Sequence, residues 1–164
     1  MPGAVCTCLK GIEDIDDNDP VIFNDCDHMF ACRAFLARIF DDRPLDFEGA
    51  LLSFESNEPK FSYIEFDDSG NIVGTVEKQV VSNRAICGAY VFANAALFRQ
   101  MSERYFKTCR YKEYFVSGVF NELCKADKHL AEFKTDFHLS FGTPTEYEAA
   151  IGSKHFDEVS GDCQ

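Results

Sequence analysis

Residues 21–28 read Val-Ile-Phe-Asn-Asp-Cys-Asp-His and carry the strongest signal for the fold. The stretch begins with three apolar residues and ends in a polar segment. A compact apolar run closed by polar residues is typical of a buried strand whose carboxyl end opens at a site. The stretch therefore predicts a strand at 21–23, with Asp25, Asp27 and His28 just beyond its end.

Helices and strands are expected to alternate on both sides of this stretch. The turn at 67–70 lies between two segments of alternating polarity and predicts a hairpin. The alternation of strands with helices predicts an α/β fold with a mixed, mostly parallel central sheet flanked by helices. The expected helices are 3–14, 31–40, 94–106, 114–126 and one beginning at Thr143, and the expected strands besides 21–23 are 49–54, 61–66, 72–76, 85–93 and 130–137.

Length and composition narrow the class of protein. The 164 residues, of which 17 are Phe, suffice for one folded domain, expected at 1–153 and followed by a polar tail at 154–164. The formal charge of −12 argues against binding to nucleic acid or to anionic membranes. The sequence contains no apolar run of the ~20 residues that a membrane helix needs and no secretory signal. These features predict a cytoplasmic protein.

The eight cysteines stand singly in apolar or periodic stretches. Disulfide frameworks belong mainly to small secreted chains, whereas isolated cysteines commonly behave as small buried hydrophobes. Cys6-Thr7-Cys8 is a lone C-x-C pair, and structural zinc needs a second pair. The cysteines therefore indicate a reduced protein without a structural metal.

Two short motifs could carry chemistry. Asp25 and Asp27 place two carboxylates at the end of a buried strand, which suits Mg²⁺ or Mn²⁺ shared with phosphate oxygens; an Asx-rich turn that caps the next helix is the alternative. Glu77 and Lys78 follow the hairpin, where a carboxylate could accept bonds from sugar hydroxyls while an ammonium neutralises a phosphate. An exposed ion pair at a strand end is the alternative there.

Two glycine motifs add weaker signals. Gly88 lies inside the strand expected at 85–93, and a glycine within a strand marks either a close approach by a ligand or a bulge. Gly142 precedes Thr143-Pro144, which is the pattern of a helix start with a threonine cap. Several phenylalanines, among them Phe92 and Phe120, are interpreted as core.

The order of these motifs along the chain resembles that of the sugar-phosphate nucleotidyltransferases, which have a glycosyltransferase-A-like fold. The resemblance covers about residues 3–151. It rests on the following series, in this order: the D-x-D-H at 25–28, Pro59-Lys60-x-Ser62-Tyr63, Asp67-Asp68-x-Gly70, Glu77-Lys78, Gly88-x-Tyr90-x-Phe92, Glu113-Tyr114-Phe115-Val116-Ser117 and Gly142-Thr143-Pro144-x-Glu146-Tyr147.

The resemblance implies a reaction and a set of roles. Such enzymes join a nucleoside triphosphate to a sugar 1-phosphate and release pyrophosphate, with Mg²⁺ and basic side chains stabilising charge. The implied catalytic residues are Asp27, as a metal ligand helped by Asp25, and Lys78, which holds a phosphate. The implied substrate-binding residues are Glu77 at the sugar hydroxyls, Gly88 and Tyr90 on the strand beneath the sugar, Glu113 near the sugar, and Gly3 near the nucleotide base.

The chain departs from the family pattern in two places. The family begins with a strand and a Gly-rich loop that carries a basic residue, and neither precedes Gly3. Ser140 stands where many members have a second metal-binding aspartate. The resemblance thus implies an N-terminally truncated form that keeps the acceptor-sugar half of the site and lacks a strand beside 21–23. We expect such a chain to self-associate as a homo-oligomer or to be completed by another polypeptide.

Three other interpretations stay open at this level. The chain could be a non-catalytic module that binds a sugar phosphate or a nucleotide-sugar, and the missing loop favours this reading. It could be a metal-dependent glycosyltransferase, which also uses a D-x-D pair, although the Glu77-Lys78 and Gly142-Thr143-Pro144 motifs disfavour it. A plain α/β domain without a site would leave the ordered motif series as coincidence.

Overall fold

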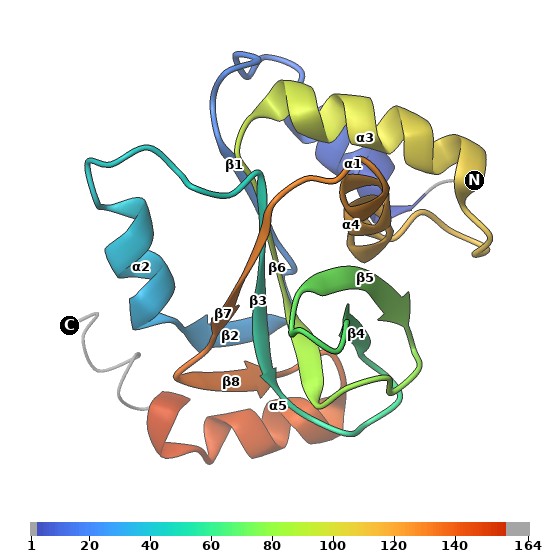
Figure 1. Ribbon diagram of the computed structural model, residues 1–164. Coiled ribbons are helices and arrows are strands. Elements are labelled where there is room, and N and C mark those ends of the chain that lie inside the picture. Colours follow the sequence, from blue (N-terminus) through green and yellow to red (C-terminus); the bar gives the residue numbers. More distant parts are fainter. Residues whose placement is uncertain (1–2, 157–164) are drawn as a thin grey trace.

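The computed structural model describes residues 3–156 and is built around a six-stranded sheet (Figure 1). A separate two-stranded ribbon lies beside it. The sheet contains β1 (Val21–Asn24), β3 (Gly49–Glu55), β4 (Ser62–Phe66), β5 (Ile72–Glu77), β6 (Arg84–Phe92) and β7 (Leu130–Lys134); the ribbon contains β2 (His28–Ala31) and β8 (Phe137–Ser140); the helices are α1 (Ala4–Gly11), α2 (Arg33–Ile39), α3 (Ala95–Thr108), α4 (Val116–Lys125) and α5 (Pro144–Ile151).

Strand β6 organises the sheet. One of its edges pairs with β3 along most of its length, from Arg84 to Phe92. Its other edge is divided: β1 pairs with residues 89–92, and β4 pairs at Ala85. The divided edge leaves a break in the pairing around Gly88, between the end of β1 and the start of β4.

The mixed α/β class with a central sheet flanked by helices is confirmed. The pairing differs from the expected one, because β3 and β7 form the only parallel pair among the described strands. Strands β1, β3 and β7 do run in one direction, but β6 is inserted between β1 and β3 and runs against both. Strand β4 runs against both of its neighbours, β5 and β6, and its short connection to β5 forms a hairpin, whereas a parallel pair would need a long crossover.

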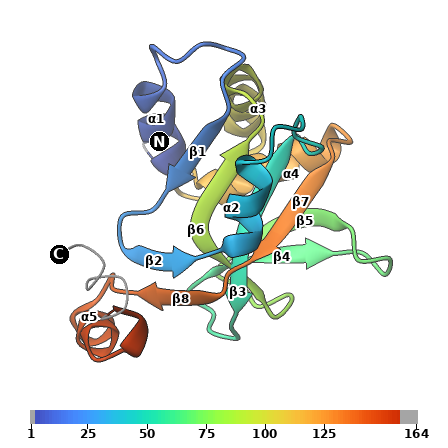
Figure 2. The same cartoon turned by 90° about the vertical axis from the view of Figure 1, so that its left-hand side faces the viewer.

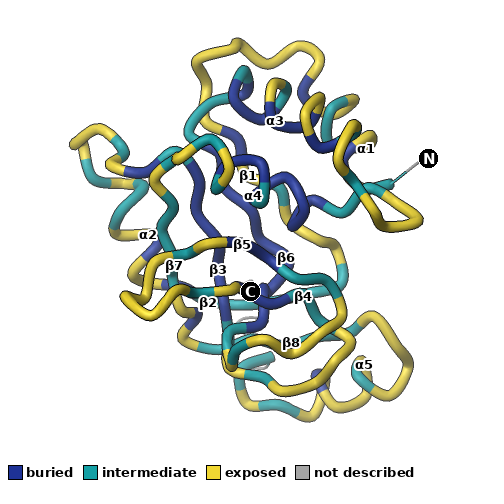
Figure 3. The backbone as a smooth tube through the Cα atoms, turned by 45° about the vertical axis from the view of Figure 1, so that its right-hand side comes forward, coloured by how far each residue is buried: buried dark blue, intermediate teal, exposed yellow. Residues whose placement is uncertain are grey.

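Two apolar clusters hold the layers together. Helices α1, α3 and α4 cover one face of the sheet, where Phe92, Phe98 and Phe120 meet in ring contacts. Helix α2 covers the other face, over a cluster that includes Cys32 and Cys87. Figure 3 shows the buried backbone concentrated along β3 and β6. Cys32 and Cys87 are therefore core residues. No disulfide joins the cysteines within residues 3–156.

The last expected strand is shorter than the sequence indicates. In place of one strand at 130–137, β7 ends at Lys134 and β8 begins at Phe137, and β8 leaves the sheet to pair with β2 (Figure 2). The break is fixed by hydrogen bonds: Thr135 N–H donates to Ser53 O, and Asp136 N–H donates to Ala31 O. Local patterning does not reveal the ribbon, because its strands are four residues long and lie far apart in the sequence.

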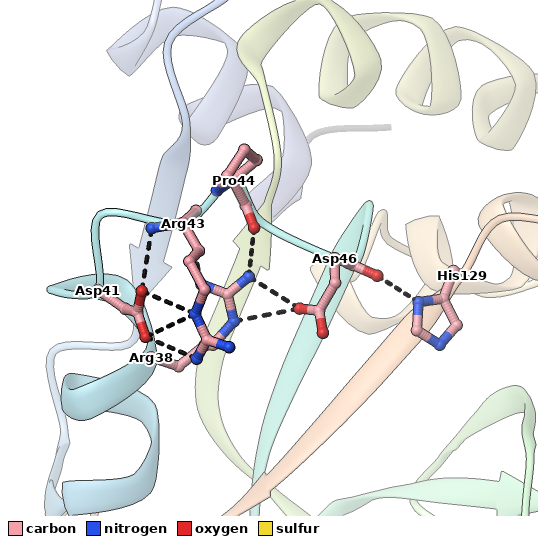
Figure 4. A network of polar contacts seen from close by, with 6 residues as sticks. All are labelled: Arg38, Asp41, Arg43, Pro44, Asp46 and His129. Atoms are coloured by element: carbon pink, nitrogen blue, oxygen red, sulfur yellow. Dashed lines mark hydrogen bonds and ion pairs between the residues drawn. The ribbon is translucent and has the colours of Figure 1, made fainter.

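Polar contacts fix the loop between α2 and β3. The Arg38 guanidinium donates to the carbonyl of Pro44 at 2.6 Å and to the carboxylate of Asp46 at 2.9 Å (Figure 4). The Asp46 carbonyl in turn accepts a hydrogen bond from His129 Nδ1 at 2.5 Å. This network joins the end of α2 to the start of β7, at the end of the sheet opposite the β2–β8 ribbon.

Several local predictions are confirmed. The hairpin at 61–76 forms as β4–β5. The Thr143 hydroxyl accepts from Glu146 N–H and caps α5 as expected; the Glu146 carboxylate accepts from this same hydroxyl, not from the Thr143 backbone N–H as in a full capping box. No described helix is long and apolar enough to cross a membrane. Only residues 154–156 of the predicted polar tail lie within the described part of the chain.

Substitution of one buried and one exposed phenylalanine tests the assignment of the core. Phe120 is 0% exposed and Phe40 is 80% exposed. We expect Phe120→Ala to lower the free energy of unfolding by about 3–5 kcal/mol, through lost burial and a cavity, and Phe40→Ala to change it by less than about 0.5 kcal/mol. Urea denaturation of both variants measures this, and equal losses would contradict the assignment of the core.

Candidate functional site

The site lies at the break in the β6 edge. Gly88 has a left-handed backbone (φ +82°), and the register between β3 and β6 shifts beside it, so this glycine forms a bulge. The Asp25 N–H donates to Gly88 O at 2.9 Å. A Cβ on Gly88 would lie 2.8 Å from Asp25 Oδ2. Both the backbone conformation and the space therefore require a glycine here, and its bare backbone lets Asp25 pack over the strand.

A cavity of about 350 Å³ opens at this bulge. Its volume is at the lower end of the ~300–1,000 Å³ usual for small-molecule sites. It brings together residues from the start of α1, the β1–β2 loop, β2, β4, β5, β6 and the start of α4, which come from distant parts of the chain. Its lining consists of Ala4, Asp25, Asp27, His28, Lys60, Phe61, Ser62, Glu77, Lys78, Ile86, Gly88, Tyr90, Phe115 and Val116.

Two carboxylates of the cavity lining, those of Asp25 and Asp27, each lie against the backbone of a glycine. Burial raises the pKa of Asp25, and the nearby charges of Asp27 and Glu77 raise it further. Asp27 lies against Gly142, where a Cβ would be 2.5 Å from Asp27 Oδ2. The described residues contain no cluster of three or more His, Cys, Asp or Glu side chains suited to a metal. Two carboxylates nevertheless fit Mg²⁺, which keeps several waters and shares phosphate oxygens.

Glu77 and Lys78 also line the cavity. Glu77 Oε2 accepts hydrogen bonds from the hydroxyls of Ser62 at 2.5 Å and Ser117 at 2.9 Å, which fix the carboxylate in place. Lys78 has a left-handed backbone (φ +55°), which is strained for a residue with a side chain. Its ammonium lies 5.5 Å from the ring centroid of Phe115. The turn at Lys78 thus directs two charged side chains toward the same cavity.

Of the eight predicted site residues, six line the cavity and two do not. Tyr90 reaches it, but its ring is buried against Phe120 in the core. Gly3 lies outside the lining, and a Cβ there would be 2.4 Å from the backbone nitrogen of Tyr114, so packing alone requires this glycine. Glu113 is exposed and also lies outside the lining. A nucleotide role for Gly3 and a sugar role for Glu113 stay predictions.

Two lining residues, Lys60 and Ser62, and one residue behind the lining, Ser117, were not assigned a role from the sequence. Lys60 is paired with Glu146 at 2.5 Å and with Glu58 at 2.9 Å, so its charge is largely neutralised. Ser62 and Ser117 hold Glu77, and only their hydroxyl chemistry could have suggested this. Lys60, Ser62 and Ser117 do belong to the motif series that carries the family resemblance, but spacing alone gives them no function.

His28 extends the site into the ribbon. Its Nδ1 lies 2.7 Å from His138 Nε2, and its Nε2 lies 3.5 Å from Asp27 Oδ1. The His138 ring is stacked on Phe54 at 3.7 Å. Burial, and secondarily the neighbouring charges of His28 and Lys60, lower the pKa of His138 to about 4. His138 is therefore neutral at pH 7.

Comparisons with known proteins give a fold but no close relative. No family model matches the sequence, and no curated protein sequence matches it. Among solved structures, a nucleoside-diphosphate-sugar pyrophosphorylase from Vibrio cholerae has a TM-score of 0.72 at 19% identity, covering 90% of this chain and 64% of its own.

Two further structures agree with the first. A protein assigned as a glucose-1-phosphate thymidylyltransferase from Bacillus anthracis, in complex with sucrose, has a TM-score of 0.69 at 17% identity, covering 90% of this chain and 59% of its own. The inositol-1-phosphate CTP transferase from T. maritima has a TM-score of 0.67 at 13% identity, with 96% and 61% covered. This chain spans about three fifths of their length. It has the fold of sugar-phosphate nucleotidyltransferases.

The bulge at Gly88 can be tested by a single substitution. Gly88→Ala should lower the free energy of unfolding by about 1–3 kcal/mol, because alanine is strained at positive φ and its Cβ would collide with Asp25. Gly11→Ala is the matched control. Gly11 is the last residue of α1, and a Cβ there meets no atom within 4 Å, so this substitution should leave the free energy of unfolding unchanged or raise it by up to about 1 kcal/mol. Chemical denaturation measures both; a neutral Gly88→Ala would contradict the bulge geometry.

The neutral His138 predicts a pH dependence. Unfolded imidazole protonates near pH 6.5, whereas folded His138 protonates near pH 4, so the unfolded chain binds the extra proton first as the pH falls. This contribution to stability is complete above pH 6.5 and is lost as the pH falls to 4. Between pH 7 and 4.5 the wild type should lose on the order of 2 kcal/mol more than His138→Gln, measured by urea denaturation. Parallel pH profiles would contradict the buried neutral imidazole.

Proposed function

We propose that this chain binds a sugar 1-phosphate together with Mg²⁺ or Mn²⁺ and serves in nucleotidyl transfer from a nucleoside triphosphate to that sugar phosphate, giving a nucleotide-sugar and pyrophosphate. The observation that carries the proposal is the convergence of Asp25, Asp27, Glu77 and Lys78 on one cavity at the Gly88 bulge. The fold, shared with structures described as nucleotidyltransferases of sugar or inositol phosphates, supports the same reaction class.

Charge balance in the cavity supports a bound divalent cation. Three carboxylates, those of Asp25, Asp27 and Glu77, face one unpaired ammonium, Lys78. A phosphate would be repelled by this set unless a cation neutralised part of it. Asp25 and Asp27 would hold Mg²⁺ or Mn²⁺, and the cation would offset the negative charge of the phosphates.

Glu77, Lys78 and Gly88 suit the sugar phosphate. Because Ser62 and Ser117 both donate to Glu77 Oε2, the second carboxylate oxygen is left to accept a sugar hydroxyl. The Lys78 ammonium, next to Glu77, would pair with the phosphate. The bare backbone of Gly88 would let the sugar approach β6 closely.

In the proposed transfer, a phosphate oxygen of the sugar 1-phosphate attacks the α-phosphorus of the triphosphate, and the bond from that phosphorus to the pyrophosphate oxygen breaks. No base is needed, because a phosphate monoester is already largely ionised at pH 7, with a second pKa of about 6. The residues of this chain therefore act by positioning the attacking group and by stabilising charge.

A non-catalytic binding module is the second candidate. The small cavity and the partial coverage of the neighbouring structures favour a chain that holds the sugar phosphate while another polypeptide supplies the triphosphate site. Strand β1 has no strand partner on its second edge among residues 3–156, and Ile22 is 50% exposed there. We propose that a further strand, from a second copy or another polypeptide in the cytoplasm, completes the sheet at this edge.

Calorimetric titration with a panel of sugar 1-phosphates tests the binding. Asp27→Asn and Glu77→Gln should weaken the affinity about tenfold or more, because each removes a charge-assisted contact, and removal of Mg²⁺ with EDTA should do the same. Asp68→Asn and Glu103→Gln, both exposed and outside the cavity lining, are controls that should bind like the wild type.

The titration has a clear contrary result. Equal affinity of Asp27→Asn, Glu77→Gln and the wild type, in chains that unfold cooperatively, would overturn the proposed site. Pyrophosphate release from a nucleoside triphosphate in the same samples separates the two candidates. Release identifies a catalytic chain, and binding without release identifies a binding module.

A further inference from the structure

The outer edge of β1 presents backbone groups that no described strand pairs. Asp25 N–H donates to Gly88 O, and the register of β1 with β6 continues from there without a shift. Residues of an antiparallel strand point their N–H and C=O groups alternately toward its two sides. Those of Ile22 and Asn24 therefore point away from β6, to the side on which residues 3–156 supply no strand.

An apolar groove lies directly beside this edge. It has a volume of about 590 Å³ and is lined mostly by apolar residues, among them Ile22, Ile39 and Val91. Val91 and Ile39 belong to the cluster beneath α2, so the groove opens on that face of the sheet. The two polar residues of the lining, Asp41 and Arg43, pair with each other at 2.6 Å.

One wall of the groove is held in place by polar contacts. The Arg38 guanidinium donates to the carbonyls of Arg43 and Pro44 and to the carboxylate of Asp46 (Figure 4). These bonds fix the loop between α2 and β3, which forms this wall. Because the groove is already shaped in the free chain, a partner that fills it does not have to order the loop.

The surroundings of the groove are acidic. The segment 13–19, which leads into β1, is exposed and contains five acidic residues and no basic one. Asp19 precedes the lining residue Pro20, and Asp42 lies between the lining residues Asp41 and Arg43. Neither Asp19 nor Asp42 forms an ion pair with another residue of the described part. A partner that carries Lys or Arg side chains beside its apolar ones would complement this charge.

A second copy of this chain fits the edge poorly. A two-fold axis perpendicular to the sheet would pair the two β1 strands antiparallel. Residues 25–27 of each copy would then lie close to the acidic segment 13–19 of the other. Like charges placed opposite each other destabilise strand pairing, and the charge of −12 on each chain opposes association further.

We propose that the β1 edge and its groove form a docking surface for an extended, basic segment of a different polypeptide. The segment adds a strand to β1, places alternate apolar side chains in the groove and pairs its Lys or Arg side chains with the surrounding carboxylates. This inference rests on the proposed completion of the sheet at β1 and specifies the chemistry of the partner. It does not depend on the sugar phosphate site.

Amide NMR of the nitrogen-15-labelled full chain, titrated with synthetic peptides, tests the docking surface. The probe is Lys-Lys-Val-Thr-Val-Thr-Val-Lys-Lys with blocked ends. One control peptide has Glu for every Lys, and the other has Ser for every Val. The signals of Ile22, Asn24 and Leu45 should respond first to the probe, which should bind about tenfold more tightly than either control because each control lacks one half of the complementarity.

Two substitutions at one position separate strand addition from general attraction to an acidic chain. Ile22→Pro removes the N–H that faces outward and leaves the hydrogen bonds between β1 and β6, so it should weaken binding of the probe about tenfold or more. Ile22→Val keeps this N–H and an apolar side chain and should bind within about twofold of the wild type.

A pair of charge variants decides the matter if Ile22→Pro does not fold. The double variant Asp19→Asn, Asp42→Asn should weaken binding of the probe about threefold to tenfold. The double variant Asp68→Asn, Glu148→Gln makes the same change in net charge at exposed positions outside the groove and should bind like the wild type.

Four results would overturn the docking surface. They are no binding of the probe at about 1 mM, equal binding of the probe and a control peptide, undiminished binding by a folded Ile22→Pro variant, and a homodimer in sedimentation equilibrium that this variant dissociates. Sugar 1-phosphate titration of the same samples tests the proposed function separately, because Ile22 does not line the Gly88 cavity. Sugar phosphate binding without probe binding overturns the docking surface alone.

Discussion

The left-handed backbone of Gly88 is the constraint on which the site depends. The bulge at this residue interrupts β6 between its pairing with β1 and its pairing with β4. The interruption leaves an opening between these two strands. Asp25 packs over the glycine and hydrogen-bonds to its carbonyl. A side chain at this position would close the space that the carboxylate occupies. Gly88 therefore both shapes the sheet and leaves room for the Asp25 carboxylate.

Most charged side chains of the cavity lie at or beside two small substructures, the β2–β8 ribbon and the β4–β5 hairpin. Asp27 immediately precedes β2 and His28 is its first residue, while Glu77 ends β5 and Lys78 follows it. Lys60 is engaged with Glu58 and Glu146, so Lys78 is the one cation of the lining without a carboxylate partner. In a chain of formal charge −12, a phosphate ligand needs added positive charge, which a divalent cation would supply.

The sequence predicts elements whose pattern is local. The hairpin, the helix cap at Thr143 and the strand at 21–24 follow from alternation, turn residues and short apolar runs. The β2–β8 ribbon could not be predicted in this way, because its pairing joins residues more than 100 positions apart and its break depends on contacts of Thr135 and Asp136. Six site residues were found from the ordered motifs. Ser117 also belongs to that series, but its contact with Glu77, and that of His138 with His28, emerged only from the three-dimensional packing.

The central claim is that the carboxylates at the Gly88 bulge hold the divalent cation. Paramagnetic broadening by substoichiometric Mn²⁺, followed in the amide NMR spectrum of the full chain, tests it most directly. The account predicts that amides of residues 25–28, Gly88 and Gly142 broaden first. First broadening at residues 13–19, the exposed and densely acidic turn after α1, would show adventitious binding to surface charge and would contradict the account.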